Sequence, residues 1–268
     1  MKRIFVAILV SSIVAVSASA FLGAGVVELD EAKVLVEINA TDGDAGFHAF
    51  FDGDPWMVMR LRCPDGELGF RLRMKGKVAE QGMTEGFFES SEPSFEDQPL
   101  EEFLDRFPEG TYQFNGRTTK GEWLTGDAEL THELPAGAVV ELEQEDEEIE
   151  VEGEVDPNED LEVEWDAVTT RFATDDPQGK NTSPLESEIV LYVVILEVDD
   201  DEVDRVIRYE VLPEEADEDG EFSLEIDDDL LLPGLDYKIE VGAREESGNQ
   251  TFWEFPFTTA EDDDEDED

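Results

Sequence analysis

The side chains best suited to bind a metal ion gather in two short acidic turns. Asp-Gly-Asp occurs twice, ten residues apart, and supplies Asp42, Asp44, Asp52 and Asp54. Carboxylates clustered on loops are the oxygen ligands that Ca²⁺ selects. An EF-hand loop beginning at Asp42 would need glycine at its sixth position and glutamate at its twelfth, where Phe47 and Gly53 stand. Because Asp-Gly is also favoured in hairpin turns, weak Ca²⁺ binding and plain turn chemistry both stay open.

A second candidate site is a run of basic side chains in a chain with 73 acidic residues and a net charge of −55. Apolar and basic residues alternate along segments 56–63 and 68–75, which predicts a β-hairpin with one basic face. Like charges that oppose one another on a hairpin destabilise it, so anionic groups are expected nearby. They are either the protein's own carboxylates, such as Glu85 and Glu89, or an acidic polysaccharide or partner protein. The basic residues are Arg60, Arg62, Arg71, Arg73 and Lys75, extended by Lys77.

No catalytic, cofactor-binding or metal-binding residue is predicted from a motif. The two histidines, His48 and His132, have no zinc-ligand spacing, and Ser90 and Ser91 lack a nucleophile elbow. The single cysteine, Cys63, excludes an intramolecular disulfide and ends an apolar-alternating strand, which favours a small buried side chain. We expect a protein that is not an enzyme and needs no cofactor. A hydrolase with an unrecognised carboxylate pair is one alternative.

The elements that must position these residues are mostly strands. Segment 32–40 is β-branched and apolar, and the acidic turns at 41–46 and 52–55 bound the strand that follows. The only clear helical spacing lies in PLEEFLDRF, residues 99–107, with prolines at both ends. Two further strands, 111–118 and 122–133, surround a Lys-Gly turn. The first half is therefore expected to be a β-sandwich with one short helix.

The first twenty residues and the charge distribution predict an exported, salt-requiring protein. Lys2 and Arg3 precede an apolar run that ends in Ala-Ser-Ala at 18–20, the pattern of a secretory signal peptide. Residues 21–140 carry 24 acidic and 10 basic side chains, a net of −14, whereas 141–268 carry 49 and 6, a net of −43. Such acidity disfavours nucleic acid and anionic lipid as partners, and no later segment is apolar enough to span a membrane. We expect a secreted or periplasmic, halophilic protein.

The second half resembles a fibronectin type III domain. Segment 161–168 holds Trp165 where that family has its core tryptophan, and 189–198 holds Tyr192 on the next matching strand. Segment 222–226 is similar to a further inward-facing strand, and 252–259 to the closing strand. The connection 167–188 is longer than usual, and no Arg-Gly-Asp occurs. The most specific match is in 231–243, through Leu231, Pro233, Gly234, Tyr237, Ile239, Val241 and Ala243. The resemblance implies an immunoglobulin-like sandwich, with Tyr237 as its tyrosine corner.

Together these patterns predict an all-β chain of two sandwich-like domains. The expected order is a signal peptide at 1–20, a mostly-β domain of unrecognised family at 21–140, an acidic linker or edge strand at 141–155, a fibronectin type III-like domain at 156–260 and an acidic tail at 261–268. The expected function is a non-catalytic binding or spacer protein whose partner is a protein or polysaccharide. The alternative from another class is a Ca²⁺-dependent adhesion or carbohydrate-binding module that uses weakly bound divalent cations.

Overall fold

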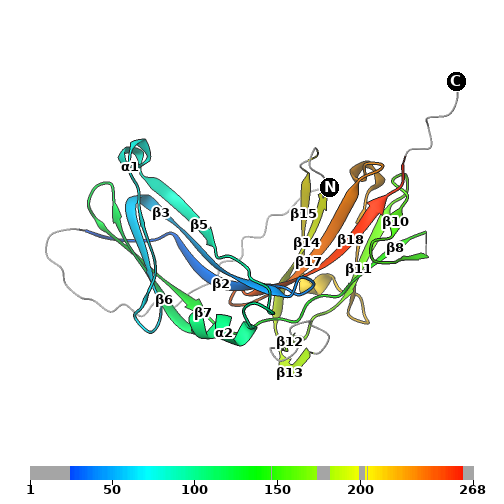
Figure 1. The fold of residues 1–268 in the computed structure, drawn as a ribbon, viewed down its shortest axis with the longest axis horizontal. Coiled ribbons are helices and arrows are strands. Elements are labelled where there is room, and N and C mark those ends of the chain that lie inside the picture. Colours follow the sequence, from blue (N-terminus) through cyan, green and yellow to red (C-terminus); the bar gives the residue numbers. More distant parts are fainter. Residues whose placement is uncertain (1–24, 146, 174–181, 199–202, 204, 262–268) are drawn as a thin grey trace.

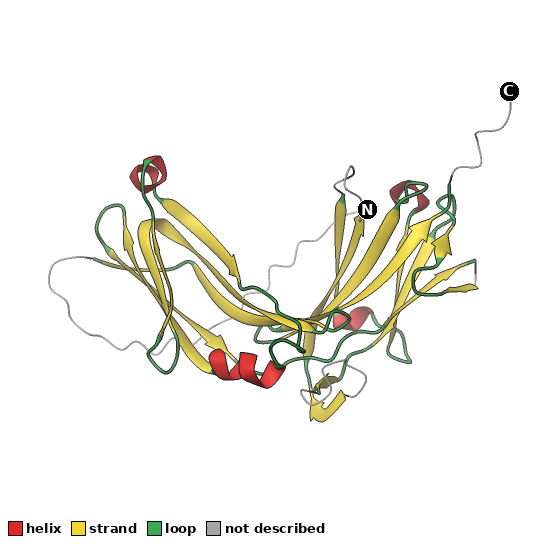
Figure 2. Cartoon of the chain, in the orientation of Figure 1, coloured by secondary structure: helices red, strands yellow, loops and turns green. Residues whose placement is uncertain are grey.

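The chain is all β, as predicted, and folds into two sandwiches that lie side by side (Figures 1 and 2). The computed structural model describes residues 25–145, 147–173, 182–198, 203 and 205–261. Within them, no helix is long and apolar enough to cross a membrane. The expected signal peptide at 1–20 and all but the first residue of the acidic tail lie outside the described residues.

The first sandwich packs two layers of strands over an aromatic core. One layer contains β2, β5 and the first part of β3; the other contains the rest of β3 with β4, β6, β7 and β1. Phe51 in the first layer lies 5.3 Å from Phe114 in the second, measured between ring centroids. The strands are β1 (Val26–Glu28), β2 (Glu31–Asn39), β3 (Asp44–Arg62), β4 (Leu68–Arg73), β5 (Met83–Glu89), β6 (Gly110–Thr118) and β7 (Trp123–Leu130).

The 19-residue strand β3 crosses both layers and corrects one prediction. The turn expected at 52–55 is absent: the strand continues through these residues, and only its pairing register shifts between Asp52 and Trp56. Phe51 and Trp56 are both buried on either side of the shift, so the core holds the chain extended there. Tertiary burial thus overrides the local turn preference of Asp-Gly-Asp-Pro.

Two short helices accompany the first sandwich. The helix expected at 99–107 is α2 (Leu100–Arg106), and it buries Leu100 and Phe103 against the core. The structure adds a one-turn helix, α1 (Lys77–Gln81), between Gly76 and Gly82, which both have positive φ. Since α1 buries none of its residues, it has no apolar periodicity by which the sequence could reveal it.

The second sandwich has the strand order of an immunoglobulin-like fold. One sheet runs β16-β11-β8-β9, and the facing strands run β15-β14-β17-β18. The residues expected to form an acidic linker or edge strand hold β8, β9 and β10. The bounds are β8 (Val140–Gln144), β9 (Glu147–Ile149), β10 (Glu154–Val155), β11 (Leu161–Asp166), β14 (Ile189–Val198), β15 (Val206–Val211), β16 (Glu221–Ile226), β17 (Asp236–Glu245) and β18 (Gln250–Thr259), with 3₁₀ turns at Pro213–Glu215 and Asp228–Leu230.

The residues that carried the sequence resemblance lie in the core of this sandwich. Trp165 stacks on Phe222 with 5.2 Å between ring centroids. The Tyr192 hydroxyl accepts a hydrogen bond of 2.7 Å from the backbone N–H of Val168. Tyr237 accepts one of the same length from the N–H of Leu232, which is the geometry of a tyrosine corner. The long connection after β11 forms a separate hairpin of β12 (Thr170–Phe172) and β13 (Thr182–Glu186).

One continuous sheet joins the two sandwiches. Strand β18 pairs in parallel with β2, so the sheet passes from one sandwich into the other (Figure 1). Trp253 on β18 packs against both hydrophobic cores. Asn249, fully buried at the start of β18, accepts a hydrogen bond of 2.9 Å from Val36 N–H and donates one of 3.0 Å to the carbonyl of Thr131. The two sandwiches are therefore joined by strand pairing, shared core packing and buried hydrogen bonds.

Candidate functional site

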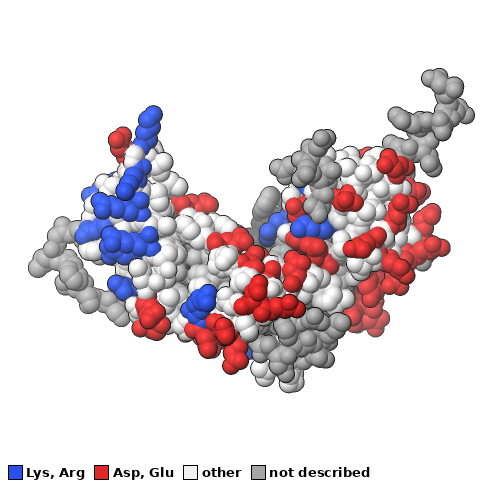
Figure 3. Space-filling model, in the orientation of Figure 1, with Lys and Arg blue, Asp and Glu red and all other residues white. Residues whose placement is uncertain are grey.

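The four arginines singled out in the sequence lie together on the outer face of the first sandwich, whereas Lys75 follows β4 and Lys77 begins α1. Arg60 lies directly opposite Arg71 across the β3–β4 pair, and Arg73 follows on the same face of β4. Strand β6 adds Arg117, opposite Val58 on the other edge of β3. Figure 3 shows Lys and Arg gathered over this sandwich, whereas Asp and Glu cover the second. We call Arg60, Arg62, Arg71, Arg73 and Arg117 the basic face.

Within the described part of the chain, the protein's own Asp and Glu carboxylates do not neutralise the basic face. No carboxylate oxygen there lies within 4.0 Å of these five arginines or of Lys75 and Lys77. Glu85 and Glu89, the candidate partners from the sequence, lie on β5 beside the first part of β3, opposite Asp52 and His48. The guanidinium groups that do find partners bond backbone oxygens: Arg62 to Gly66 at 3.1 Å and Arg117 to Gly121 at 2.6 Å. The face keeps its charge available for an external anion.

Trp123 belongs to the same surface. The Arg117 guanidinium carbon lies 3.5 Å from the Trp123 ring centroid, which is a cation–π contact. Arg117 and Trp123 are directly opposite on β6 and β7, next to the Asn115–Thr125 pair. Trp123 therefore supports an arginine, which covers one face of its ring.

The four aspartates considered for Ca²⁺ are not brought together. Asp44 and Asp52 are eight residues apart on β3, a separation of ~26 Å along an extended strand. Asp44 instead accepts a hydrogen bond of 2.8 Å from the Asn39 side chain, and Asp52 bonds the N–H of Gly53. One ion cannot be shared between the two Asp-Gly-Asp segments, and among the described residues none of the four joins a cluster of metal-ligand geometry.

A cluster that the sequence did not indicate lies beside the junction. Glu37 on β2, His48 on β3 and Glu92 after β5 place one ligand atom each within 4.8 Å of one another. Glu37 and His48 also line a hollow of about 560 Å³ that both sandwiches enclose. Glu37 and His48 are close because β2 and β3 pair antiparallel. Glu92 comes from the segment after β5, where the sequence shows no local pattern. Glu92 is not among the residues that line the hollow.

His132 and Ser90 form hydrogen bonds with backbone groups of the fold. His132 Nε2 lies 2.8 Å from the carbonyl oxygen of Phe107. The Ser90 hydroxyl accepts a bond of 3.0 Å from Phe47 N–H and donates one of 3.1 Å to the Ser91 carbonyl. Cys63 is half-buried, and burial, with Asp65 and Glu67 nearby, raises the pKa of its thiol. Raised thiol pKa values disfavour the reactive thiolate.

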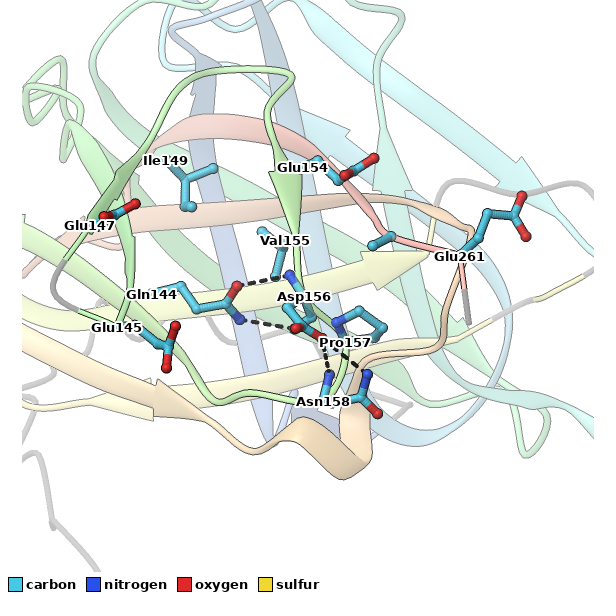
Figure 4. Close-up of a pocket in the computed structure, with 11 residues that line it drawn as sticks. Gln144, Glu145, Glu147, Ile149, Glu154, Val155, Asp156, Pro157, Asn158 and Glu261 are labelled. Atoms are coloured by element: carbon cyan, nitrogen blue, oxygen red, sulfur yellow. Dashed lines mark hydrogen bonds between the residues drawn. The ribbon is translucent and has the colours of Figure 1, made fainter. Parts of the chain in front are cut away.

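A second hollow, of about 470 Å³, lies at the far end of the second sandwich (Figure 4). Hydrogen bonds connect its lining residues: the Gln144 side-chain amide donates to the backbone carbonyl of Asp156 at 2.9 Å and accepts from the Asp156 N–H at 2.8 Å. The Asp156 carboxylate accepts from Asn158 N–H, and these backbone and side-chain bonds hold the pKa of Asp156 below its ordinary value. The network closes a turn, and the carboxylates around it face solvent.

Comparisons with known proteins give distant structural similarities only. No family model and no curated protein matches the chain. Solved structures that it resembles include one described as "host cell surface retention of a 1.5-MDa bacterial ice-binding adhesin" (13% identity, TM-score 0.27, 86% of this chain and 65% of that one). Others are a tetra-tandem repeat from the extending region of a large adhesion protein (11%, 0.25, 85% and 49%) and the chicken CNTN1 FN1–FN3 domains (14%, 0.29, 88% and 69%). The chain thus spans less than two thirds of the two adhesin chains, and the fold assignment rests on its own strand order.

Proposed function

We propose that this protein is an exported, non-catalytic binding protein whose first sandwich holds an acidic polysaccharide on the basic face. The observation that carries the proposal is a set of arginines on adjacent strands that have no carboxylate partner in the described chain. Like charges lie directly opposite one another at Arg60 and Arg71, which costs stability locally, and an anion bound across them would relieve that repulsion. Planar guanidinium groups bind carboxylate or sulfate groups in pairs of hydrogen bonds.

The second sandwich acts in this proposal as a fibronectin type III-like spacer. Its tyrosine corner, core tryptophan and strand order support that assignment. The continuous sheet and the buried Asn249 fix it against the first sandwich. Its dense negative charge keeps the anionic ligand away from this half, so the ligand is directed to the basic face.

Neutralising the basic face is expected to weaken polysaccharide binding about tenfold or more, equal to ~1.4 kcal/mol. The variant is Arg60→Gln, Arg71→Gln and Arg73→Gln, which removes three positive charges from adjacent positions on β3 and β4. Dextran sulfate is the probe and neutral dextran the blank, with affinity measured by calorimetry in a salt concentration that keeps the protein folded. Because these arginines have no described carboxylate partner, the fold should be retained.

The matched control removes the same charge elsewhere, through Lys33→Gln, Arg106→Gln and Arg205→Gln. It should bind dextran sulfate like the wild type, because none of the three lies on the basic face. Equal losses in both triple variants would show that only net charge matters. Failure of the wild-type protein to bind the sulfated polymer would exclude this class of polysaccharide as its partner.

A further inference from the structure

Three side chains from separate segments converge beside the junction of the two sandwiches. Glu37 projects from β2, His48 from the adjacent β3, and Glu92 from the segment that follows β5. Their ligand atoms all lie within 4.8 Å of one another, and His48 Nε2 is 4.0 Å from Glu37 Oε1. An imidazole nitrogen and two carboxylates are a donor set found at transition-metal sites, and Zn²⁺ commonly uses three protein ligands and a water.

The cluster contains buried polar atoms without partners. His48 is 7% exposed, and its Nε2 has no hydrogen-bond partner. Glu92 Oε1 is also buried and has no hydrogen-bond partner. Folded proteins rarely leave such atoms unsatisfied, and each exception calls for an explanation such as an ion. Both atoms belong to the same cluster, so one bound cation would satisfy both.

The surrounding charge supports a cation at this position. Burial, together with the nearby carboxylates of Asp44 and Glu89, raises the pKa of Glu92 to about 7. Burial likewise raises the pKa of Glu37, although His48 and the Gln250 side chain act in the opposite direction. The nearby ammonium group of Lys238 is engaged elsewhere, 3.1 Å from Glu240 and 3.5 Å from Glu197. A divalent ion would remove the repulsion that these carboxylates otherwise carry.

Neighbouring residues position two of the three ligands. Gln250 on β18 donates a hydrogen bond to Glu37 Oε2, which leaves Oε1 directed toward His48. The orientation of a ligand by a hydrogen bond from a neighbour is usual at metal sites. Gly46 makes room for Glu92, since a Cβ at that position would lie 2.4 Å from Glu92 Oε1. A larger residue at this position would therefore displace the Glu92 carboxyl from its present place.

We propose that Glu37, His48 and Glu92 bind one divalent transition-metal ion of the Zn²⁺ class. A tetrahedral ion at ~2.1 Å from each donor holds the donors ~3.4 Å apart, so small side-chain rotations close the site. Imidazole favours Zn²⁺ and its neighbours in the transition series over Ca²⁺, which prefers oxygen ligands alone. Through Gln250 the ion also connects to β18, so binding would tighten the junction. This site is separate from the basic face and does not depend on polysaccharide binding.

The first test uses the two histidines as internal probes. The full-length protein, stripped with EDTA and labelled with ¹⁵N-histidine, is titrated with Zn²⁺ alone at fixed ionic strength. The proposal predicts a large change in the Nε2 resonance of His48, complete at one ion per chain. His132 should not respond, because its Nε2 contacts the Phe107 carbonyl. A resonance of His48 that does not move, or a titration that responds equally to Ca²⁺, would overturn the proposal.

The second test compares two glutamates with the same charge. Glu92→Gln should weaken Zn²⁺ binding at least ~10-fold in calorimetry, since loss of a direct ligand exceeds the usual cost of losing a supporting one. Glu89→Gln is the matched control: Glu89 lies opposite His48 on β5 but outside the ligand set. This variant removes the same charge without removing a ligand, so it should weaken Zn²⁺ binding much less than Glu92→Gln. Equal effects of the two variants would show that Zn²⁺ responds to local charge alone, which contradicts a three-ligand site.

Discussion

Transfer from about 1 M to about 0.01 M NaCl is expected to unfold the second sandwich, because the Debye length grows from ~3 Å to ~30 Å. The net charge of −43 on residues 141–268 then repels itself across the whole half. Circular dichroism and tryptophan fluorescence during stepwise dilution measure the loss of structure. Restoring the salt should restore the fold.

The structure shows where this repulsion is concentrated. On the outer face of the β16-β11-β8 sheet, Glu162 lies opposite both Glu225 and Glu143, and Glu164 lies opposite Glu141. Directly opposed like charges destabilise a strand pair. Glu162→Gln with Glu164→Gln should therefore lower the salt concentration at which half of the protein is folded. A pair in the loop before β16, Glu214→Gln with Glu218→Gln, changes the charge equally and should have a smaller effect.

Acidification provides an independent check of the same cause. Burial, followed by the charges of Glu143 and Glu162, raises the pKa of Glu164 above its ordinary 4.5. A carboxyl whose folded pKa is raised stabilises the fold below the unfolded pKa and loses that stabilisation as pH rises through the folded value. In low salt, lowering the pH from 7 toward 5 should stabilise the second sandwich.

The type of salt gives a control for the dilution experiment. If sulfate stabilises the fold and chloride does not, the salt acts through exclusion from the protein surface and not through charge screening.

The resemblance to a fibronectin type III domain located the main strands of the second sandwich. The residues that carried it are in the core: Trp165 stacks on Phe222, and the hydroxyls of Tyr192 and Tyr237 accept backbone hydrogen bonds. The helix α2 was predicted from a local pattern, because its apolar residues repeat at helical spacing and prolines bound it. For α2 the information that determines the structure lies within a few residues of the element.

Sequence alone was insufficient where contacts join distant segments. The continuation of β3 through a strong turn sequence depends on core residues on both sides of it, and those act only after the layers have formed. Glu92 reaches His48 from another segment, and Asn249 reaches Val36 across 213 residues. The basic face was predicted as a hairpin, but the absence of carboxylate partners in the described chain required coordinates.

Asn249→Ala is expected to destabilise the protein by about 3 kcal/mol, because it leaves two backbone groups of the first sandwich, one buried and one partly buried, without partners at ~1–3 kcal/mol each. These are the N–H of Val36 and the carbonyl of Thr131, each bonded by the Asn249 side chain. For a chain of this size the melting temperature should fall by roughly 6–12 °C. Differential scanning calorimetry in high salt measures the change and shows whether the sandwiches still unfold together.

The control is Asn158→Ala, which removes an exposed asparagine from a turn of the second sandwich. Its effect should be within about 1 kcal/mol, since water replaces the partners of an exposed side chain. If Asn249→Ala melts like this control, the parallel pairing of β18 with β2 and the packing of Trp253 hold the junction without the asparagine. If it separates one transition into two, the buried amide couples the folding of the two sandwiches. The second outcome is expected, because Asn249 directly precedes Gln250, where the pairing of β18 with β2 begins.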